Sequence, residues 1–237
     1  MATNVIGAIA RLDWIAIGAA LDERGWAVTP AILGADECAE LIGLYDHREH
    51  FRSRVDMARM RFGLGEYKYF AAPLPPIVTA MRTALYERLV PTASAWMRAL
   101  RLGEGLPARL DGFIAICHGA GQIKPTPLML RYDAGGYNCM HQDLYGEIFF
   151  PIQATILLSD RMVDFEGGEF MLIEQRPRAQ SRACAITLER GQAIIFATRY
   201  RPHRGAHGYS RASVRHGVST VARGRRFSLG IIFHDAR

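Results

Sequence analysis

The chain has 237 residues, of which 49% are hydrophobic and 22% charged, so it can bury a core and is not a disordered chain. No apolar run approaches the ~20 residues that a membrane span needs. The first basic residue, Arg11, comes too late for a signal peptide. The four cysteines are widely spaced and form no CxxC pair. We therefore expect a cytoplasmic protein without a disulfide framework and without membrane contact.

The charge is unevenly distributed along the chain, whose net charge is +6. Between Arg190 and His234 the sequence contains nine arginines and neither Asp nor Glu. Codon usage could explain arginine in place of lysine, but it does not explain the lack of acids. This stretch predicts a basic surface that faces an anionic partner such as a nucleic acid.

The first hundred residues are predicted to be mostly helical. Apolar residues recur at helical spacing over residues 12–24, and this helix should stop at Gly25. Residues 35–45 form a second amphipathic pattern, with acids in the first turn, where the helix dipole favours them. After a proline cluster, a long pattern covers residues 77–102, and Pro91 should kink or divide it.

From about Gly112 the pattern changes to short runs rich in β-branched and aromatic residues, separated by Gly, Asn and Asp. Such spacing is typical of a β-sandwich or barrel. The predicted strands are residues 127–132, 147–158, 169–174, 193–196, 218–221 and 227–233. The sequence thus predicts one α+β domain over residues 1–237, with 1–110 as a mainly helical support and 111–237 as the β core.

Three pieces of the β region carry candidate chemistry. His141 and Asp143 are two residues apart in an extended segment, so both side chains point to one side. His216 stands at the start of a later strand. Two histidines and one carboxylate form the facial triad of non-haem Fe(II) oxygenases and leave three metal positions open for a 2-oxo acid and O2. Arg226, ten residues after His216, can pair with the far carboxylate of that acid, and Ser228 adds a hydroxyl on the same strand face.

These residues fit a longer pattern, H-x-V-x-x-V-x-x-G-x-R-x-S, which runs from His216 to Ser228. With it the chain resembles the Fe(II)- and 2-oxoglutarate-dependent oxygenases over residues 127–233. The resemblance implies a double-stranded β-helix of the jelly-roll type, with a helical N-terminal layer. It also implies Fe(II), 2-oxoglutarate and O2, with metal ligands His141, Asp143 and His216. Tyr132 stands where two branches of these oxygenases have a tyrosine that contacts 2-oxoglutarate, but it could equally be a core residue.

Other residues are weaker candidates. Five other histidines are unsuitable as the distal metal ligand because of their positions in the sequence. Two of them lie in a Gly- and Arg-rich stretch predicted to be a loop, namely His203 and His207. The other three are His47, His50 and His118. His234 comes after the arginine that should follow the ligand. A zinc site lacks the usual spacing of Cys and His. The stretch DFEGGEF, residues 164–170, is similar to a turn of the prolyl hydroxylase-like branch, although we favour a plain hairpin.

Four further segments carry a resemblance of the whole chain, namely residues 51–70, 117–147, 174–182 and 215–236. Through them the chain resembles a narrower bacterial family described as oxygenases that act on damaged DNA. It departs from the well-known alkylation-repair oxygenases at Leu130, where they have Asn. The ten-residue step from His216 to Arg226 is instead similar to prolyl hydroxylases.

Four function classes remain open. The first is an oxygenase of alkylated bases in DNA or RNA, in which arginines hold phosphates and aromatic rings stack an extruded base. The others are a hydroxylase of protein side chains, an oxygenase of a small anionic metabolite, and a binding module without catalysis. Residues 47–70 either serve the nucleic acid or form a helix and loop with aromatics in the core. The sequence leaves the oligomeric state open. Candidate substrate contacts are Arg61, Tyr67, Tyr69, Arg201, Arg204 and Arg211.

Overall fold

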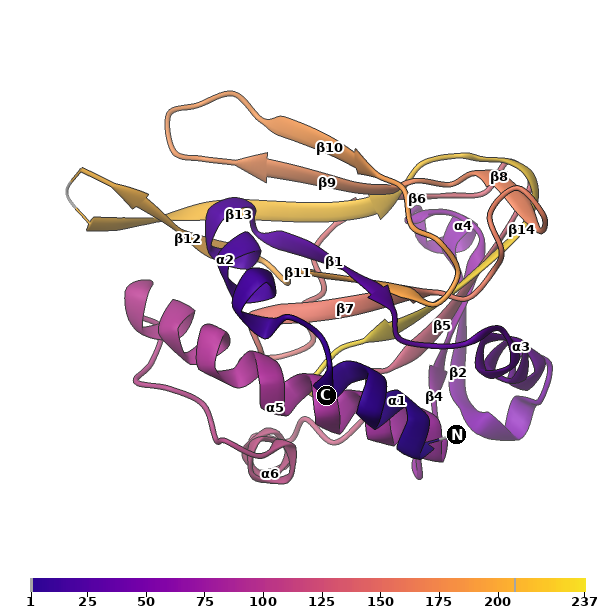
Figure 1. The fold of residues 1–237 in the computed structure, drawn as a ribbon, viewed down its shortest axis with the longest axis horizontal. Coiled ribbons are helices and arrows are strands. Elements are labelled where there is room, and N and C mark those ends of the chain that lie inside the picture. Colours follow the sequence, from indigo (N-terminus) through magenta and orange to yellow (C-terminus); the bar gives the residue numbers. More distant parts are fainter. Residues whose placement is uncertain (1, 207) are drawn as a thin grey trace.

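The computed structural model describes residues 2–206 and 208–237. The longest helix and its neighbours lie below two antiparallel sheets in Figure 1. The helices are α1 (Ala2–Ala10), α2 (Trp14–Arg24), α3 (Ala35–Leu44), α4 (Met57–Met60), α5 (Pro76–Ala99) and α6 (Leu110–Gly119), with a 3-10 turn at Arg48–His50. The first strands are β1 (Trp26–Ala31), β2 (Phe51–Asp56), β3 (Gly63–Leu64), β4 (Glu66–Phe70), β5 (Leu128–Asp133), β6 (Tyr137–His141) and β7 (Ile152–Leu157). The later strands are β8 (Phe165–Gly167), β9 (Phe170–Gln175), β10 (Arg182–Ile186), β11 (Gln192–Ala197), β12 (Tyr200–Gly205), β13 (Gly208–Val218) and β14 (Val221–Ile231).

The two sheets form a jelly-roll core of the double-stranded β-helix type. The larger sheet has the order β1-β11-β7-β14-β5-β4-β2, and β8 pairs with β14. The smaller sheet has the order β10-β9-β13-β6-β3, and β12 pairs with β13. The chain crosses between the sheets several times, as it does from β5 to β6 and from β6 to β7, and residues from both sheets line the interior. The predicted α+β class with this core is confirmed.

Local signals explain why the helices form where they do. The side chain of Asp13 accepts a hydrogen bond of 2.9 Å from the backbone of Ala16 at the start of α2, and Gly25 ends that helix with a positive φ of 84°. Proline at its first position starts α5, where a missing N–H costs nothing. The long helix continues through Pro91. The predicted division at Pro91 is therefore wrong.

Most segments whose secondary structure was predicted wrongly are strands that carry polar side chains. Residues 47–70, weighed as helix and loop, contain the short helix α4 but otherwise form mainly β2, β3 and β4, and two of these strands extend the larger sheet. The stretch around His203, predicted to be a loop, is the β12–β13 hairpin. The predicted hairpin at residues 164–170 is wrong as well, because β8 pairs with β14 rather than with β9. The predicted strand at 218–221 is not a separate strand, because Val218 ends β13, Val221 begins β14 and residues 219–220 connect them.

The core lies between the sheets and under the helices. Buried apolar side chains run without interruption from α1 through α5 to the strands, with Val5, Leu85, Ile156 and Phe233 all at most 1% exposed. Among the described helices none is by itself long and apolar enough to cross a membrane, although the bent pair Thr3–Ala10 and Trp14–Arg24 meets that length and composition together.

Candidate active site

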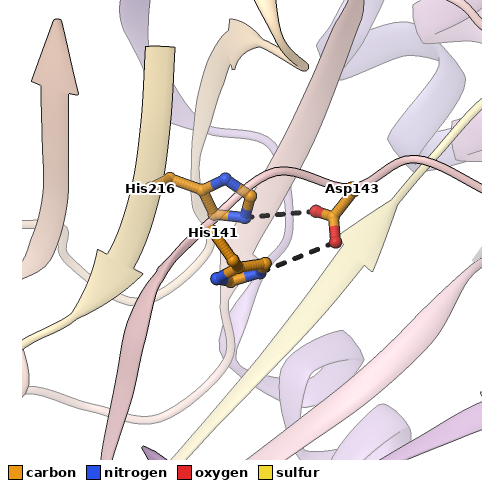
Figure 2. Close-up of side chains that lie close together, drawn as sticks. All are labelled: His141, Asp143 and His216. Atoms are coloured by element: carbon orange, nitrogen blue, oxygen red, sulfur yellow. Dashed lines mark ion pairs between the residues drawn. The ribbon is translucent and has the colours of Figure 1, made fainter. Parts of the chain in front are cut away.

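The structure brings His141, Asp143 and His216 together. His141 ends β6 and lies directly opposite His216 of β13 in the antiparallel ladder, so the two imidazoles share one face. Asp143 follows in the segment after β6 and turns its carboxylate towards both rings (Figure 2). His216 Nε2 lies 3.1 Å from Asp143 Oδ2, and His141 Nε2 lies 3.6 Å from Asp143 Oδ1.

This arrangement fits a metal ion. One donor atom from each of the three residues can be chosen so that all lie within 4.8 Å of one another. Two ligands about 2.1 Å from an ion and at right angles to each other are about 3.0 Å apart, close to the separation of His216 and Asp143. His141 Nδ1 donates a 2.8 Å hydrogen bond to the carbonyl of Cys139, which orients the ring with Nε2 towards Asp143.

The protonation states also suit a cation. Burial would raise the pKa of Asp143, but His216 and His141 outweigh it and hold that pKa well below its usual range. Burial, aided by the charge of His141, lowers the pKa of His216, so the ring is neutral at neutral pH. The carboxylate is thus charged and the buried imidazole is free to ligate.

A chain of tyrosines supports the carboxylate from behind. Tyr145 donates a 2.8 Å hydrogen bond to Asp143 Oδ1 and accepts one of 2.9 Å from Tyr69. Burial and the charge of Asp143 raise the pKa of Tyr145 well above its usual value, so its hydroxyl keeps the proton it donates. One carboxylate oxygen is therefore engaged by protein, and the other faces His216. Sequence reasoning missed Tyr145, which stands two residues after Asp143.

The triad lines a cavity of about 210 Å³ between the two sheets. Apolar and aromatic side chains form most of its wall. Besides the triad, its lining includes Phe62, Tyr67, Leu128, Leu130, Tyr132, Asn138, Leu144, Tyr145, Gln153, Phe170, Ser228 and Ile232. Gln153 is 2% exposed and its Nε2 atom bonds to no described residue. Sequence reasoning missed Gln153 too, because one glutamine in an apolar strand carries no signal.

Arg226 is a buried cation that reaches this cavity through Ser228, and the nearby Glu169 acts on it without forming an ion pair. It is 1% exposed, and it forms no ion pair with any described residue. Its Nη1 donates a 3.1 Å hydrogen bond to Ser228, which lines the cavity, while Nε has no partner. Its guanidinium carbon is 5.8 Å from the ring centroid of Tyr132. Burial lowers the pKa of Arg226. Such a group is ready to receive a carboxylate.

Two glycines at the end of β8 make room for this arginine. Gly167 and Gly168 adopt positive φ values of 73° and 61°. A Cβ atom on Gly168 would lie 2.9 Å from Cδ of Arg226, so any larger residue would displace the guanidinium. Residues 164–170, which are similar to a turn of the prolyl hydroxylase-like branch, therefore shape the site around Arg226.

The structure places the predicted substrate contacts in different surroundings. Tyr67 lines the cavity, and Tyr69 is buried behind it in the hydrogen bond to Tyr145. Arg61 is exposed next to Phe62 at the cavity rim. Arg204 and Arg211 are exposed on the β12–β13 hairpin, away from the cavity lining. Their roles stay predictions.

Arg201 is a correction. It is 1% exposed, and its Nε donates to Glu174 at 2.5 Å, so it is not available to an external phosphate. Other arginines of the acid-free stretch also find acids from distant parts of the chain; these pairs are Arg190–Asp160, Arg223–Glu166 and Arg225–Asp133. The basic surface is consequently smaller than the sequence indicated.

The remaining histidines are not placed beside the triad ligands. His118 pairs with Asp235 at 3.0 Å, and His234 is buried and accepts a 3.2 Å hydrogen bond from the backbone of Phe150. Burial lowers the pKa of His234 to about 4. His203 is half-buried on β12, and His207 lies outside the described residues.

Comparisons with known proteins agree with this geometry. Two uncharacterized proteins, from Mycobacterium tuberculosis strains H37Rv and CDC 1551, are each 48% identical to the chain over 167 residues, covering 70% of this chain and 72% of theirs. Among solved structures, a Pseudomonas putida prolyl-4-hydroxylase has a TM-score of 0.51 at 18% identity, covering 94% of this chain and 99% of that one.

A prolyl hydroxylase from Trichoplax adhaerens, solved with a peptide fragment of hypoxia inducible factor, has a TM-score of 0.57 at 15% identity, covering 94% of this chain and 89% of that one. At these identities the solved structures establish the fold. A family model described as an oxygenase catalysing oxidative methylation of damaged DNA matches residues 65–236. The chain therefore belongs to that family, and with its HxD…H triad it is an Fe(II)- and 2-oxoglutarate-dependent oxygenase.

Proposed function

We propose that the protein removes alkyl groups from damaged nucleic acid bases by hydroxylating the carbon attached to the base. His141, Asp143 and His216 would hold Fe(II), and Arg226 with Ser228 would hold the distal carboxylate of 2-oxoglutarate. Bound there, these groups supply the oxidation of a C–H bond by O2, with release of succinate and CO2. A hydroxymethyl group on a base nitrogen then leaves as formaldehyde.

The observation that carries the proposal is the shared cavity. The three triad residues open onto the same space as Ser228, which bonds to the unpaired Arg226, so the metal and an acid co-substrate have adjoining sites. Tyr132 closes this end as a fully buried wall. Burial raises the pKa of Tyr132, so its hydroxyl stays protonated and can donate to an anion.

The lining of the cavity favours a flat ring as the substrate group. The cavity of about 210 Å³ would also hold the co-substrate, so a polymer has room to insert at most one unit. An extruded base fits this limit, and Tyr67 and Phe62 offer aromatic surface for stacking. Membership of a family described by its action on damaged DNA supports the same choice.

A protein hydroxylase is the second candidate. The ten-residue step from His216 to Arg226 favours it, and so does the exposed apolar rim at Phe62 and Leu144, 44% and 38% exposed, which could take a peptide. The two candidates differ in their product. A hydroxylated side chain keeps its oxygen, whereas a demethylated base yields formaldehyde.

The test measures formaldehyde and succinate released from oligonucleotides carrying N-methylated bases, with Fe(II) and 2-oxoglutarate. We expect both products in equal amounts, and none from the Asp143→Ala variant, which should keep its circular dichroism spectrum but lose Mn(II) binding. Succinate that forms with a peptide panel, while no methylated oligonucleotide yields formaldehyde, would replace the proposal with the hydroxylase. A metal bound equally well by the Asp143→Ala variant would refute the ligand assignment.

A further inference from the structure

The β12–β13 hairpin has two chemically different faces. Residues directly opposite in an antiparallel pair point to the same side, and successive residues alternate. The ladder pairs Tyr200 with Ser213, Pro202 with Arg211 and Arg204 with Tyr209. Alternation along β13 adds Arg215 to this face. The opposite face carries Arg201 and Ala212, which are 1% and 0% exposed.

We call the first side the arginine–tyrosine face and define it by Tyr200, Arg204, Tyr209, Arg211 and Arg215. The three arginines are exposed, and Tyr209 is 55% exposed. None of the three arginines forms an ion pair within the described chain, in contrast to Arg201 on the opposite face. The face thus presents charge that the fold leaves uncompensated.

Rings and guanidinium groups are interleaved on this face. The Tyr200 ring lies 5.7 Å from the guanidinium carbon of Arg211 and 4.6 Å from that of Arg199. The second ring of the face is the exposed Tyr209 ring, which lies opposite Arg204 in the ladder. Arginines beside aromatic rings are the combination that binds single-stranded nucleic acid, where phosphates pair with cations and bases stack on aromatics.

The face is also connected to the cavity. Arg215 is next to His216 in β13, and β13 pairs with β6, which pairs in turn with β3. On these last two strands, Leu64 lies opposite Tyr137, and they are 46% and 41% exposed. The backbone oxygen of Phe62, a cavity-lining residue, then accepts a hydrogen bond from β6. The arginine–tyrosine face therefore lies on the outer side of β13, the strand whose inner side carries His216 in the cavity.

We propose that the arginine–tyrosine face binds the strand that flanks the target base, and that the bound strand is single-stranded. This rests on the proposed function for the nature of the polymer, but strand binding is separable from catalysis. Arg204, Arg211 and Arg215 hold phosphates, and Tyr209 stacks a base. Arg201 takes no part.

The experiment measures binding of unmethylated, fluorescein-labelled oligo-dT to the full chain by anisotropy, over a series of salt concentrations. Each phosphate contact on a single strand contributes about 0.7 to the slope of log K against log salt. The triple variant R204A/R211A/R215A should therefore lower that slope by about 2. Tyr209→Ala should weaken binding about 5- to 100-fold and leave the slope unchanged, since stacking releases no counterions.

The matched control removes the same charge elsewhere. Arg11, Arg88 and Arg182 are exposed and lie outside the face, so R11A/R88A/R182A should retain the wild-type slope within about 0.5. Equal losses in the two triple variants would mean that only net charge matters, and the proposal would be overturned. It would also be overturned if the wild-type chain binds duplex DNA better than oligo-dT, or binds neither at about 50 mM salt.

The two proposals can fail separately. Strand binding through the face without formaldehyde release from any methylated oligonucleotide rejects the proposed reaction and keeps the face. Formaldehyde release by a chain whose binding the R204A/R211A/R215A variant leaves unchanged rejects the face and keeps the reaction.

Discussion

Replacing Arg226 with methionine tests the co-substrate site most directly. The guanidinium is 1% exposed and has no carboxylate partner among the described residues, so a dicarboxylate would supply its missing counter-charge. Breaking a buried ion pair by removing one partner costs about 3–5 kcal/mol. We therefore expect Arg226→Met to weaken 2-oxoglutarate binding by roughly 150- to 5,000-fold.

The ligand-free stability should move the other way. An unpaired buried charge destabilises the empty protein, so an apolar methionine side chain in its place should leave the unfolding free energy unchanged or raise it by about 1–4 kcal/mol. In the wild type, 2-oxoglutarate at 100 times its Kd adds about 2.7 kcal/mol. At about 2–4 °C per kcal/mol for a chain of this size, that is a rise of about 5–11 °C in Tm.

Thermal unfolding with Mn(II) in place of Fe(II) measures both effects without turnover. Arg225 is the matched control, because it is exposed and pairs with Asp133 at 2.6 Å rather than reaching the cavity. Arg225→Met should keep the full 2-oxoglutarate shift. If the two variants lose that shift equally, or if Arg226→Met alone keeps it, the assignment of Arg226 is refuted.

Three further outcomes are expected. Tyr145→Phe should weaken Mn(II) binding about 10- to 100-fold, measured by calorimetry, because Asp143 loses its 2.8 Å hydrogen bond; unchanged affinity would show that the carboxylate needs no such support. His234 stays neutral in the fold with a pKa of about 4, so the folded state loses about 3 kcal/mol as pH falls from 6.5 to 4; His234→Asn should flatten this dependence in urea unfolding, and an unaltered pH profile would contradict the cause. Arg201→Ala should cost about 1.5–3 kcal/mol, because Glu174 loses a buried charged hydrogen-bond partner and keeps only Arg176; a loss below about 0.5 kcal/mol in urea unfolding would argue against that pair.

The candidate metal ligands were easier to predict from the sequence than the other residues that line the cavity. The HxD pair and His216 carry their signal locally, because a two-residue step in a strand fixes a common face whatever the rest of the chain does. Arg226 and Ser228 follow the same rule. Gln153 and Tyr145 carry no such signal, since their roles depend on which strands meet across the interior.

The errors have a common physical origin in strand alternation and pairing. Arg201 and Arg204 look alike in sequence, yet strand alternation buries one against Glu174 and exposes the other. Because the sequence predicted a loop here, it offered no strand alternation by which to assign Arg201 and Arg204 to opposite faces. The charge of the acid-free stretch was likewise counted from residues that are neighbours in sequence. Ion pairs join residues that are far apart in sequence, and Arg223 pairs with Glu166 at 2.7 Å.

The contribution of β4 has a consequence for dissecting the protein. β4 and β2 extend the larger sheet beyond β5, and β4 supplies Tyr67 and Tyr69 to the cavity and to the tyrosine chain. A fragment starting at residue 111 would lack these rings and would leave the long edge of β5 unpaired. Unpaired edges invite strand addition from other molecules. The jelly-roll half expressed alone should therefore self-associate, and catalysis by this fold cannot be transplanted without the two strands that come from the first seventy residues.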